Sequence, residues 1–166
     1  MNTTNDNDAR KKVWELIKDI RFALLITHDA ENRMHARPMS AITKEFNDEL
    51  WFLTSVRSPK LEEIARNPDV LVSYAEPKSQ TYVSIRGRAE QVQDRGKITE
   101  LWSEPARVWF PKGAEDPDIA LIRVAVENAE YWDSPASGFV YLYDYAKAAL
   151  TGERPDNVGD HKKVAM

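Results

Sequence analysis

The first apolar positions of the chain recur at helical spacing. An apolar stripe with this spacing predicts an amphipathic helix, and Asp8 is suited to cap its N-terminus. The helix is expected to reach about Asp19, whereas residues 1–7 precede the pattern and are predicted to form a disordered tail. The stripe consists of Val13, Trp14, Leu16, Ile17 and Ile20.

The pattern then changes to short apolar runs that are separated by polar turns. Residues 22–27, FALLIT, are too short and too uniformly apolar for a surface helix, so they predict a strand that is buried on both faces. A turn at 29–33 leads into a return strand at 34–44. A second turn at 44–49 leads into a strand at 50–55. These three consecutive strands are expected to pair as an antiparallel meander.

A short helix is predicted after the third strand. Ser58 followed by Pro59 is typical of an N-cap and a first helical position, and Asn67 with Pro68 marks the end of the helix. A fourth strand is expected at 69–75, because an apolar run resumes there.

The fifth predicted strand, residues 81–90, alternates between two faces. The odd-numbered positions from 83 to 89 are apolar or small, and the even-numbered positions are mostly polar. This alternation is the pattern of a half-buried strand. The polar face is therefore expected to contact solvent or a ligand. The apolar parity consists of Val83, Ile85, Gly87 and Ala89.

The remaining segments predict helix, strand and helix. Residues 94–112 are expected to be irregularly helical, since Pro105 and Pro111 interrupt them. A sixth strand is predicted from Ile119 to Trp132, with one side formed by Ile122, Val124, Val126, Glu130 and Trp132. A last helical stripe, ended by Gly152 and Pro155, consists of Phe139, Leu142, Tyr143, Ala146 and Leu150.

Six strands in largely antiparallel order, with short helices between them, indicate a mainly β, α+β protein. A small barrel is the expected architecture, because closing the sheet removes the exposed edges that an open sheet would leave. No linker divides the chain, so residues 1–166 are predicted to be one domain. Its core is expected at 8–150, followed by a C-terminal extension at 151–166.

Composition narrows the classes of function. Hydrophobic residues make up 42% of the chain, charged residues 30%, and the formal net charge is −4, which fits a globular protein and disfavours nucleic-acid binding. The chain has no cysteine, which excludes disulfides, thiolate nucleophiles and cysteine-ligated metals. Neither a signal-peptide pattern nor an apolar run long enough to cross a bilayer is present, so the cytoplasm is the expected location and no membrane partner is expected.

Hydroxyl and cationic residues follow the third strand directly. Thr54, Ser55 and Ser58 supply hydroxyl groups, and Arg57 and Lys60 supply positive charge at the start of the next helix. A helix N-terminus presents unpaired N–H groups and the positive end of the helix dipole, so a phosphate would gain donors and a favourable field there. The alternative is a capped turn in which Ser58 caps the helix and the cations are solvated.

The RPMS sequence at 37–40 is a second candidate ligand contact. Pro38 removes a ladder hydrogen bond and so marks an edge, a bulge, or a place where something other than a strand lies alongside. Arg37 and Met39 share a face by parity, where they could donate to a flat ligand and pack against it. The alternative is an edge strand with a solvated arginine.

Hydrolytic and metal chemistry have little support. A turn centred on Glu31 and Asn32 would place His28 opposite His35, close enough to share a metal, but no third ligand is evident and no metal is expected. No Ser-His-Asp spacing and no HExxH helix are present.

Taken in order, five motifs carry a resemblance to a known family. They are HARPMS, WFLTSVRSPKLEEIARNPDVLVSY, YVSIRGRAE, VWFPKG and EYWD. Over roughly residues 10–150 the chain resembles the FMN-binding split-barrel superfamily, which includes pyridoxamine-phosphate oxidase, and is most similar to its general-stress-protein branch. The resemblance implies a six-stranded antiparallel split barrel, a homodimer, and FMN (with FAD as an alternative) in a groove at the subunit interface.

The resemblance also implies which residues contact the flavin. The hydroxyl and cationic cluster falls where the family holds the phosphate, and the RPMS strand passes beside the ring system. Trp132 falls at the position from which, in this family, a residue of the other subunit reaches the cofactor. Trp109 is a candidate for the same groove. The implied cofactor-binding residues are Arg37, Pro38, Met39, Leu53, Thr54, Ser55, Ser58, Lys60, Trp109 and Trp132.

Two departures bear on the reaction. The oxidase carries a basic, histidine-containing stretch that grips pyridoxal phosphate, and SPASGFVYLYDYAKAA supplies neither feature. Tyr82 stands where the oxidase has a flavin-contacting glutamine. The expected function is therefore an FMN-dependent oxidoreductase linked to the general stress response, with no catalytic residue assigned. The alternatives are a non-catalytic flavin sensor or buffer, a haem or deazaflavin binder, and a structural dimer with an empty groove.

Overall fold

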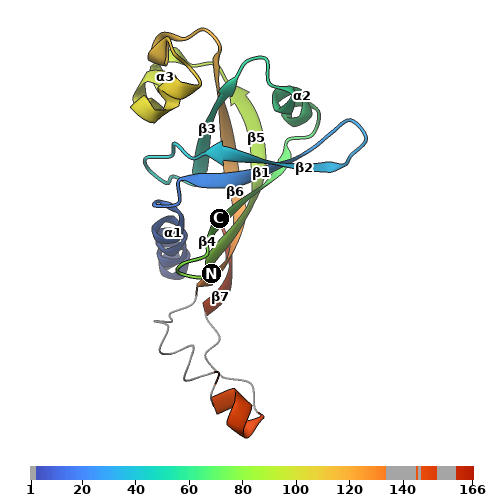
Figure 1. Cartoon of the computed structure of the whole chain (residues 1–166), viewed down its shortest axis with the longest axis vertical. Helices are drawn as coiled ribbons and strands as arrows, with labels where there is room; N and C mark the ends of the chain where they lie inside the picture. The colour runs from blue at the N-terminus through green and yellow to red at the C-terminus, as the bar shows by residue number, and fades with distance from the viewer. Residues whose placement is uncertain (1–2, 134–144, 146, 153–159) are drawn as a thin grey trace.

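The computed structural model describes residues 3–133, 145, 147–152 and 160–166. These residues are mainly strand, with short helices between the strands (Figure 1). The elements are α1 Thr3–Ile17, β1 Phe22–His28, β2 Met34–Ser40, β3 Glu49–Ser55, α2 Pro59–Arg66, β4 Asp69–Glu76, β5 Thr81–Val92, α3 Arg95–Leu101, the 3₁₀ turns η1 Glu104–Val108 and η2 Gly113–Glu115, β6 Ile119–Asp133 and β7 Asp160–Ala165.

The strands form one curled antiparallel sheet. Its order is β2-β1-β4-β5-β6-β3, and β7 pairs with β6 beyond the end of β3. An isolated bridge between Ala41, just after β2, and Phe52 of β3 brings the two ends of this order together. The arrangement confirms the predicted split barrel, although the predicted meander is wrong. β3 pairs with β6 along its whole length, and its Leu50 and Phe52 are fully buried in the barrel core.

The prediction that β1 is buried on both faces is also wrong. Ala23, Leu25 and Thr27 point into the core, but Phe22 is 50% exposed and Leu24 is 44% exposed. The strand therefore has one buried face and one open apolar face. A uniformly apolar run gives no sign of this difference.

The hairpin between β1 and β2 is shifted by one residue from the predicted pairing. His35 lies opposite Thr27, and His28 lies opposite Met34, so the two histidines do not face each other. The shift arises at the turn, where Asn32 adopts a left-handed backbone with φ of 59°. Among the described residues no group of three or more potential metal ligands gathers anywhere.

A bulge interrupts the long pairing of β5 with β6. Gly87 lies opposite Val126 and Arg86 opposite Asn128, which leaves Glu127 without a partner in the ladder. The extra residue reverses the parity of β6, so Val124 and Val126 point into the core but Glu130 and Trp132 point outward. The expected single face over Ile119 to Trp132 is therefore wrong beyond the bulge.

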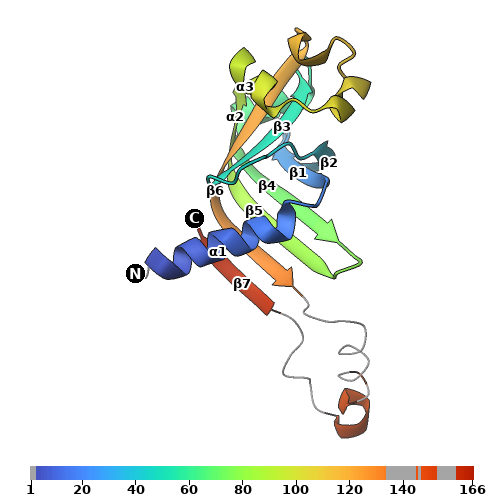
Figure 2. The same ribbon diagram turned by 90° about the vertical axis from the view of Figure 1, so that its left-hand side faces the viewer.

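Both ends of the chain pack against the lower part of the sheet (Figure 2). α1 begins at Thr3, before the expected start at Asp8, so residues 3–7 extend the helix instead of forming a tail. Val13 and Ile17 on this helix are buried in the core. In the C-terminal extension, residues 160–165 form β7.

The predicted C-terminal helical stripe lies largely outside the described residues. Residues 147–151 are helical, and Gly152 ends this helix in a left-handed conformation with its N–H donating to the carbonyl of Ala148. None of the described helices combines the length and the apolarity that crossing a membrane would require.

The apolar residues form two clusters. The larger fills the barrel and includes the buried face of α2, through Leu61 and Ile64. The smaller lies outside it, where α3 and Phe110 pack against the first half of β6 and Trp51. The candidate site lies between these clusters, with β2, β3 and α2 on one side and the η1 segment on the other.

Candidate functional site

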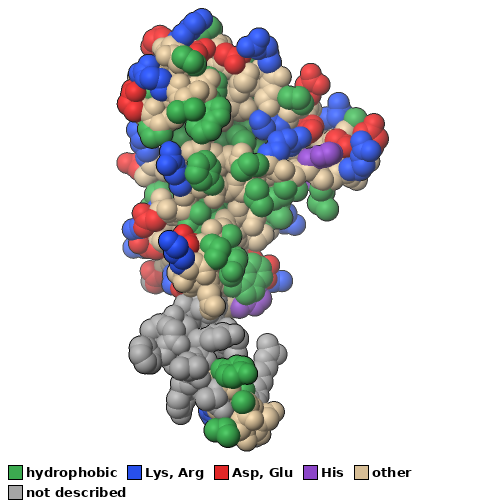
Figure 3. Space-filling view, viewed as in Figure 1, with side chains coloured by type: hydrophobic (Ala, Val, Ile, Leu, Met, Phe, Trp, Pro, Cys, Tyr) green, Lys and Arg blue, Asp and Glu red, His purple; other side chains and the backbone are tan. Residues whose placement is uncertain are grey.

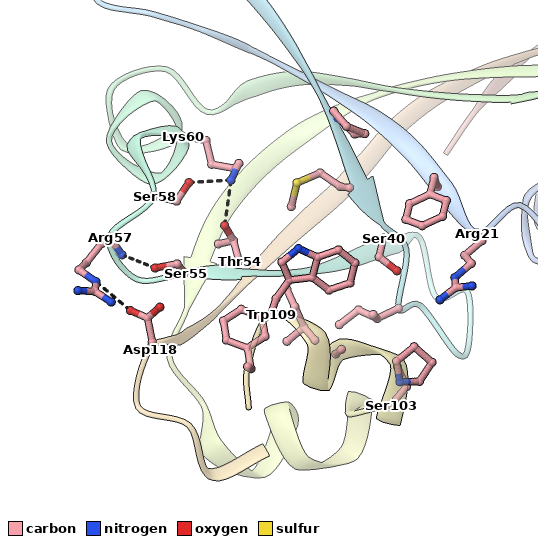
Figure 4. A pocket seen from close by; sticks show the side chains of 18 residues that line it. Arg21, Ser40, Thr54, Ser55, Arg57, Ser58, Lys60, Ser103, Trp109 and Asp118 are labelled. Atoms are coloured by element: carbon pink, nitrogen blue, oxygen red, sulfur yellow. Dashed lines mark hydrogen bonds and ion pairs between the residues drawn. The ribbon is translucent and has the colours of Figure 1, made fainter. Parts of the chain in front are cut away.

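A cavity of about 680 Å³ opens between β2, β3, the start of α2 and the η1 segment (Figure 4). One end is polar, the middle is apolar, and the opposite end carries an arginine. Its walls are formed by Arg21, Phe22, Pro38, Met39, Ser40, Ile42, Leu53, Thr54, Ser55, Arg57, Ser58, Lys60, Ser103, Pro105, Ala106, Trp109, Phe110 and Asp118.

Lys60 lies at the centre of the polar end. Its Nζ donates to Thr54 Oγ1 at 3.0 Å and to Ser58 Oγ at 2.6 Å. Within the described residues this ammonium makes no ion pair. Burial lowers the pKa of Lys60, and the positive charge of Arg37 lowers it further. A cation held by neutral hydroxyls and partly stripped of water is well suited to binding an anion.

Ser58 occupies the N-cap position of α2, as predicted, but it does not cap the helix with its side chain. Its hydroxyl accepts from Lys60 instead. Pro59 at the first helical position has no N–H, so side-chain donors supply much of the polarity at this helix end. The capped-turn alternative is therefore half right: the turn and helix form as expected, but the hydroxyl faces the cavity.

A second group of polar side chains adjoins the first. Arg57 Nε lies 3.1 Å from Asp118 Oδ1, and the backbone N–H of Arg57 donates to Ser55 Oγ at 3.1 Å. A hydrogen bond from Ser55 and the ion pair with Arg57 lower the pKa of Asp118. The carboxylate is thus charged at neutral pH and lies at the same end of the cavity as Lys60.

Arg37 is turned away from the cavity and into a network under α2. Its Nη2 lies 2.8 Å from Glu63 Oε1, and its Nη1 donates to Thr27 Oγ1 at 2.7 Å. Thr27 in turn donates to Glu63 Oε2 at 2.6 Å. Burial acts to raise the pKa of Glu63, but the hydrogen bonds from Thr27 and Arg37 outweigh it, so the pKa lies below its usual value.

The middle of the cavity is apolar. Met39 is 7% exposed and forms part of its floor, together with Leu53. Trp109 is 63% exposed and its indole ring stands over the opening, whereas the adjacent Phe110 is buried and anchors the segment. A planar aromatic ligand would find a polarizable floor and an aromatic wall here.

The opposite end of the cavity was only partly indicated by the sequence, through Ser40 of the RPMS motif. Arg21, whose guanidinium lies 5.4 Å from the ring centroid of Phe22, lines it together with Ser40 and Ser103. These residues come from three separate segments, and only Ser40 belongs to a motif that the sequence singles out. Arg21 and Ser103 have no such signal, because only the fold brings them to the cavity.

Most of the predicted cofactor-binding residues meet in this one cavity. Pro38 lies on an edge strand, as its type requires, because β2 pairs only with β1 along its length. Arg37 and Trp132 do not line the cavity, and Trp132 stacks on His161 with ring centroids 5.0 Å apart. The residues that do line it are Pro38, Met39, Leu53, Thr54, Ser55, Ser58, Lys60 and Trp109.

Comparison with known proteins agrees with the fold. Residues 8–156 match the family model described as pyridoxamine 5'-phosphate oxidase like. A crystal structure of a candidate general stress protein 26 from Jannaschia sp. CCS1 is 27% identical, with a TM-score of 0.79; the match covers 96% of this chain and 99% of that one.

Two further relatives are similar over most of the chain. The general stress FMN/FAD binding protein of Xanthomonas citri is 26% identical, with a TM-score of 0.68, and the match covers 79% of this chain and 92% of that chain. Protein bli-3 of Neurospora crassa is 24% identical over 155 residues, which are 87% of this chain and 74% of that protein. Since the family model spans well over half of the sequence, the chain belongs to the pyridoxamine 5'-phosphate oxidase-like family.

Proposed function

We propose that the chain binds FMN in this cavity and acts as a flavin-dependent oxidoreductase. The observation that carries the proposal is Lys60, a partly buried cation whose only partners among the described residues are two hydroxyls. The name of the Xanthomonas citri relative, an FMN/FAD binding protein, supports the same ligand class.

The residues present fit the chemistry of a flavin mononucleotide. Lys60 would hold the terminal phosphate, with Thr54 and Ser58 as hydroxyl donors beside it. Met39 and Leu53 would support the ring system from below, and Trp109 would shield it from water. A bound flavin would supply the electron transfer, whereas the protein would supply orientation and electrostatics.

Flavin binding can be tested directly on purified protein. We expect a visible flavin absorbance spectrum, and release of a compound with the mass of FMN on denaturation. Lys60→Ala is expected to weaken FMN binding roughly tenfold or more, because charge-assisted contacts contribute about 1.5 to 3 kcal/mol. Lys78→Ala, in the exposed turn between β4 and β5, is the matched control. Equal affinities for FMN in the two variants would refute the phosphate site.

Turnover is tested separately from binding. Rapid reduction of the flavin-loaded protein by NADH, NADPH or a reduced deazaflavin in a stopped-flow experiment would support the oxidoreductase. Tight FMN binding with negligible reduction by all three donors would favour the flavin sensor or buffer instead. The role in a general stress response is part of the same proposal and is supported by the names of the structural relatives.

We further propose that the active form is a homodimer. The outer face of the sheet carries an open apolar row, in which Phe22, Leu24, Leu71, Tyr82 and Trp132 are each 38% to 50% exposed. Figure 3 shows hydrophobic side chains gathered over this face. A row of this kind is typical of a protein interface. In the dimer, Trp132 of the second copy would reach the cavity.

Sedimentation velocity tests this assembly. We expect a species of twice the 19.0 kDa chain mass. A strict monomer that binds FMN tightly would contradict the shared groove and leave the flavin proposal intact.

A further inference from the structure

A second positive charge lies at the end of the cavity away from Lys60. Arg21 lines this end together with Ser40 and Ser103, and Figure 4 shows the three residues apart from the Lys60 cluster. They come from the position before β1, the end of β2 and the loop between α3 and η1. Three separate segments thus place a guanidinium and two hydroxyl residues at one end of the same cavity.

The surroundings hold Arg21 in place and leave its charge available. Its backbone carbonyl accepts from the N–H of Ala41 at 3.1 Å, and its guanidinium lies over the ring of Phe22. A guanidinium that packs on an aromatic face can still donate with the N–H groups at its edge. Among the described residues no carboxylate forms an ion pair with this side chain.

The distribution of charge in the cavity favours an anion at this end. Asp118 is the one carboxylate in the described cavity wall, and it lies at the opposite end. Glu104 follows Ser103 in the chain, but its carboxylate is engaged by Arg107 Nε at 2.8 Å. A negatively charged group beside Arg21 would therefore meet a cation and hydroxyl donors without a competing carboxylate from the wall.

The proposed cofactor does not match this charge. The negative charge of FMN is on its phosphate, which Lys60 would hold at the other end, and the oxidised ring system is neutral. Arg21 therefore has no charge in the cofactor to pair with, so a second molecule has to bring the anion. The adjoining wall is formed by Phe22, Ile42 and Pro105, which suits a ligand with a flat apolar body.

We infer that Arg21, with the hydroxyls of Ser40 and Ser103, binds the carboxylate of an aromatic acid, which is the substrate of the proposed reaction. The planar guanidinium fork matches a carboxylate through two parallel hydrogen bonds, which a lysine could not offer. The inference rests on the proposed flavin-dependent oxidoreductase and adds to it the chemical class of the substrate.

The test uses benzoate as the probe and benzamide as its neutral counterpart of similar shape. Each is titrated into the FMN-loaded protein, and ligand-observed NMR gives the two Kd values. In the wild type we expect benzoate to bind about tenfold tighter or more, because only the acid makes a charge-assisted contact. In Arg21→Gln this ratio is expected to fall to about threefold or less through weaker benzoate binding. Arg66→Gln, which changes an exposed arginine at the end of α2 outside the cavity, is expected to keep the wild-type ratio.

The possible failures can be told apart. Benzoate that does not bind to the wild type, or binds no tighter than benzamide, overturns this inference and leaves flavin binding standing. An unchanged ratio in Arg21→Gln overturns it as well, and a raised Kd for FMN in that variant would then assign the arginine to the flavin. A wild type that binds no FMN overturns the flavin proposal and this inference together. Because the readout is a ratio measured on one folded variant, a general loss of stability does not imitate the expected result.

Discussion

Two cations flank the start of α2, and they are held in opposite ways. Lys60 has only hydroxyl partners, whereas Arg37 has the carboxylate of Glu63 and the hydroxyl of Thr27. The two positive charges repel each other, and this repulsion contributes to the lowered pKa of Lys60. Arg37 is neutralised inside the protein and so joins β2 to α2, whereas Lys60 still has a positive charge available to a ligand. Two cations on neighbouring elements can thus serve structure or binding, according to their partners.

The largest effect is expected from removing the partner of Arg37. Glu63→Ala leaves a guanidinium only 28% exposed without its carboxylate. Because both side chains keep some contact with water, we expect a loss of about 2 to 3 kcal/mol in the free energy of unfolding, less than for a fully buried pair. Urea unfolding followed by circular dichroism measures it. Glu62→Ala, at the exposed neighbouring position on the same helix, is the control; an equal loss in both variants would contradict the structural role of Arg37.

A smaller effect of opposite sign is expected at Lys60. Lys60→Met removes a charge that burial and Arg37 both disfavour, so the unliganded protein should keep its stability or gain up to about 1 kcal/mol. Its melting temperature should therefore equal or exceed that of the wild type, although FMN no longer raises it. A clear drop in the melting temperature without ligand would show that Lys60 is structural after all.

The smallest effect is a change in the pH dependence of stability. Since the folded-state pKa of Glu63 lies below its ordinary value of 4.5, its contribution is complete above that value and is lost as the pH falls through the lower folded pKa. The stability difference between wild type and Glu63→Gln should therefore be constant near neutral pH and shrink below pH 4.5. Thermal unfolding of both proteins across this range measures it. A difference that stays constant in acid would mean that the carboxylate charge contributes nothing.

The sequence predicted most of the polar end of the cavity because its residues are neighbours in the chain. Thr54, Ser55, Ser58 and Lys60 lie within one strand–helix connection, where local rules for caps and turns apply. Asp118 could not be found in this way, since it lies far along the chain and only the pairing of β6 with β3 brings it beside Ser55 and Arg57. Likewise, the partner of Arg37 depends on how α2 packs against β1, which no local pattern reveals.

Two apolar runs show the same limit for the fold. FALLIT in β1 and IALI in β6 look alike, but only the second is buried on both faces, between the barrel core and the cluster around α3. The first has an open face because no helix of the described chain covers it. The apolar run itself predicts that a strand forms. Whether one or both faces of that strand are buried depends on which elements pack on each side.

The single extra residue in β6 also constrains how this chain can change. A Cβ on Gly87 would lie 2.3 Å from the carbonyl oxygen of Ala125, so the strand opposite the bulge has space for glycine alone. Deleting Glu127 would rotate every later side chain of β6 to the other surface, moving Tyr131 out of the interior and Trp132 into it. Relatives that share this sheet are therefore expected to tolerate substitutions along β6 far better than a one-residue change in its length.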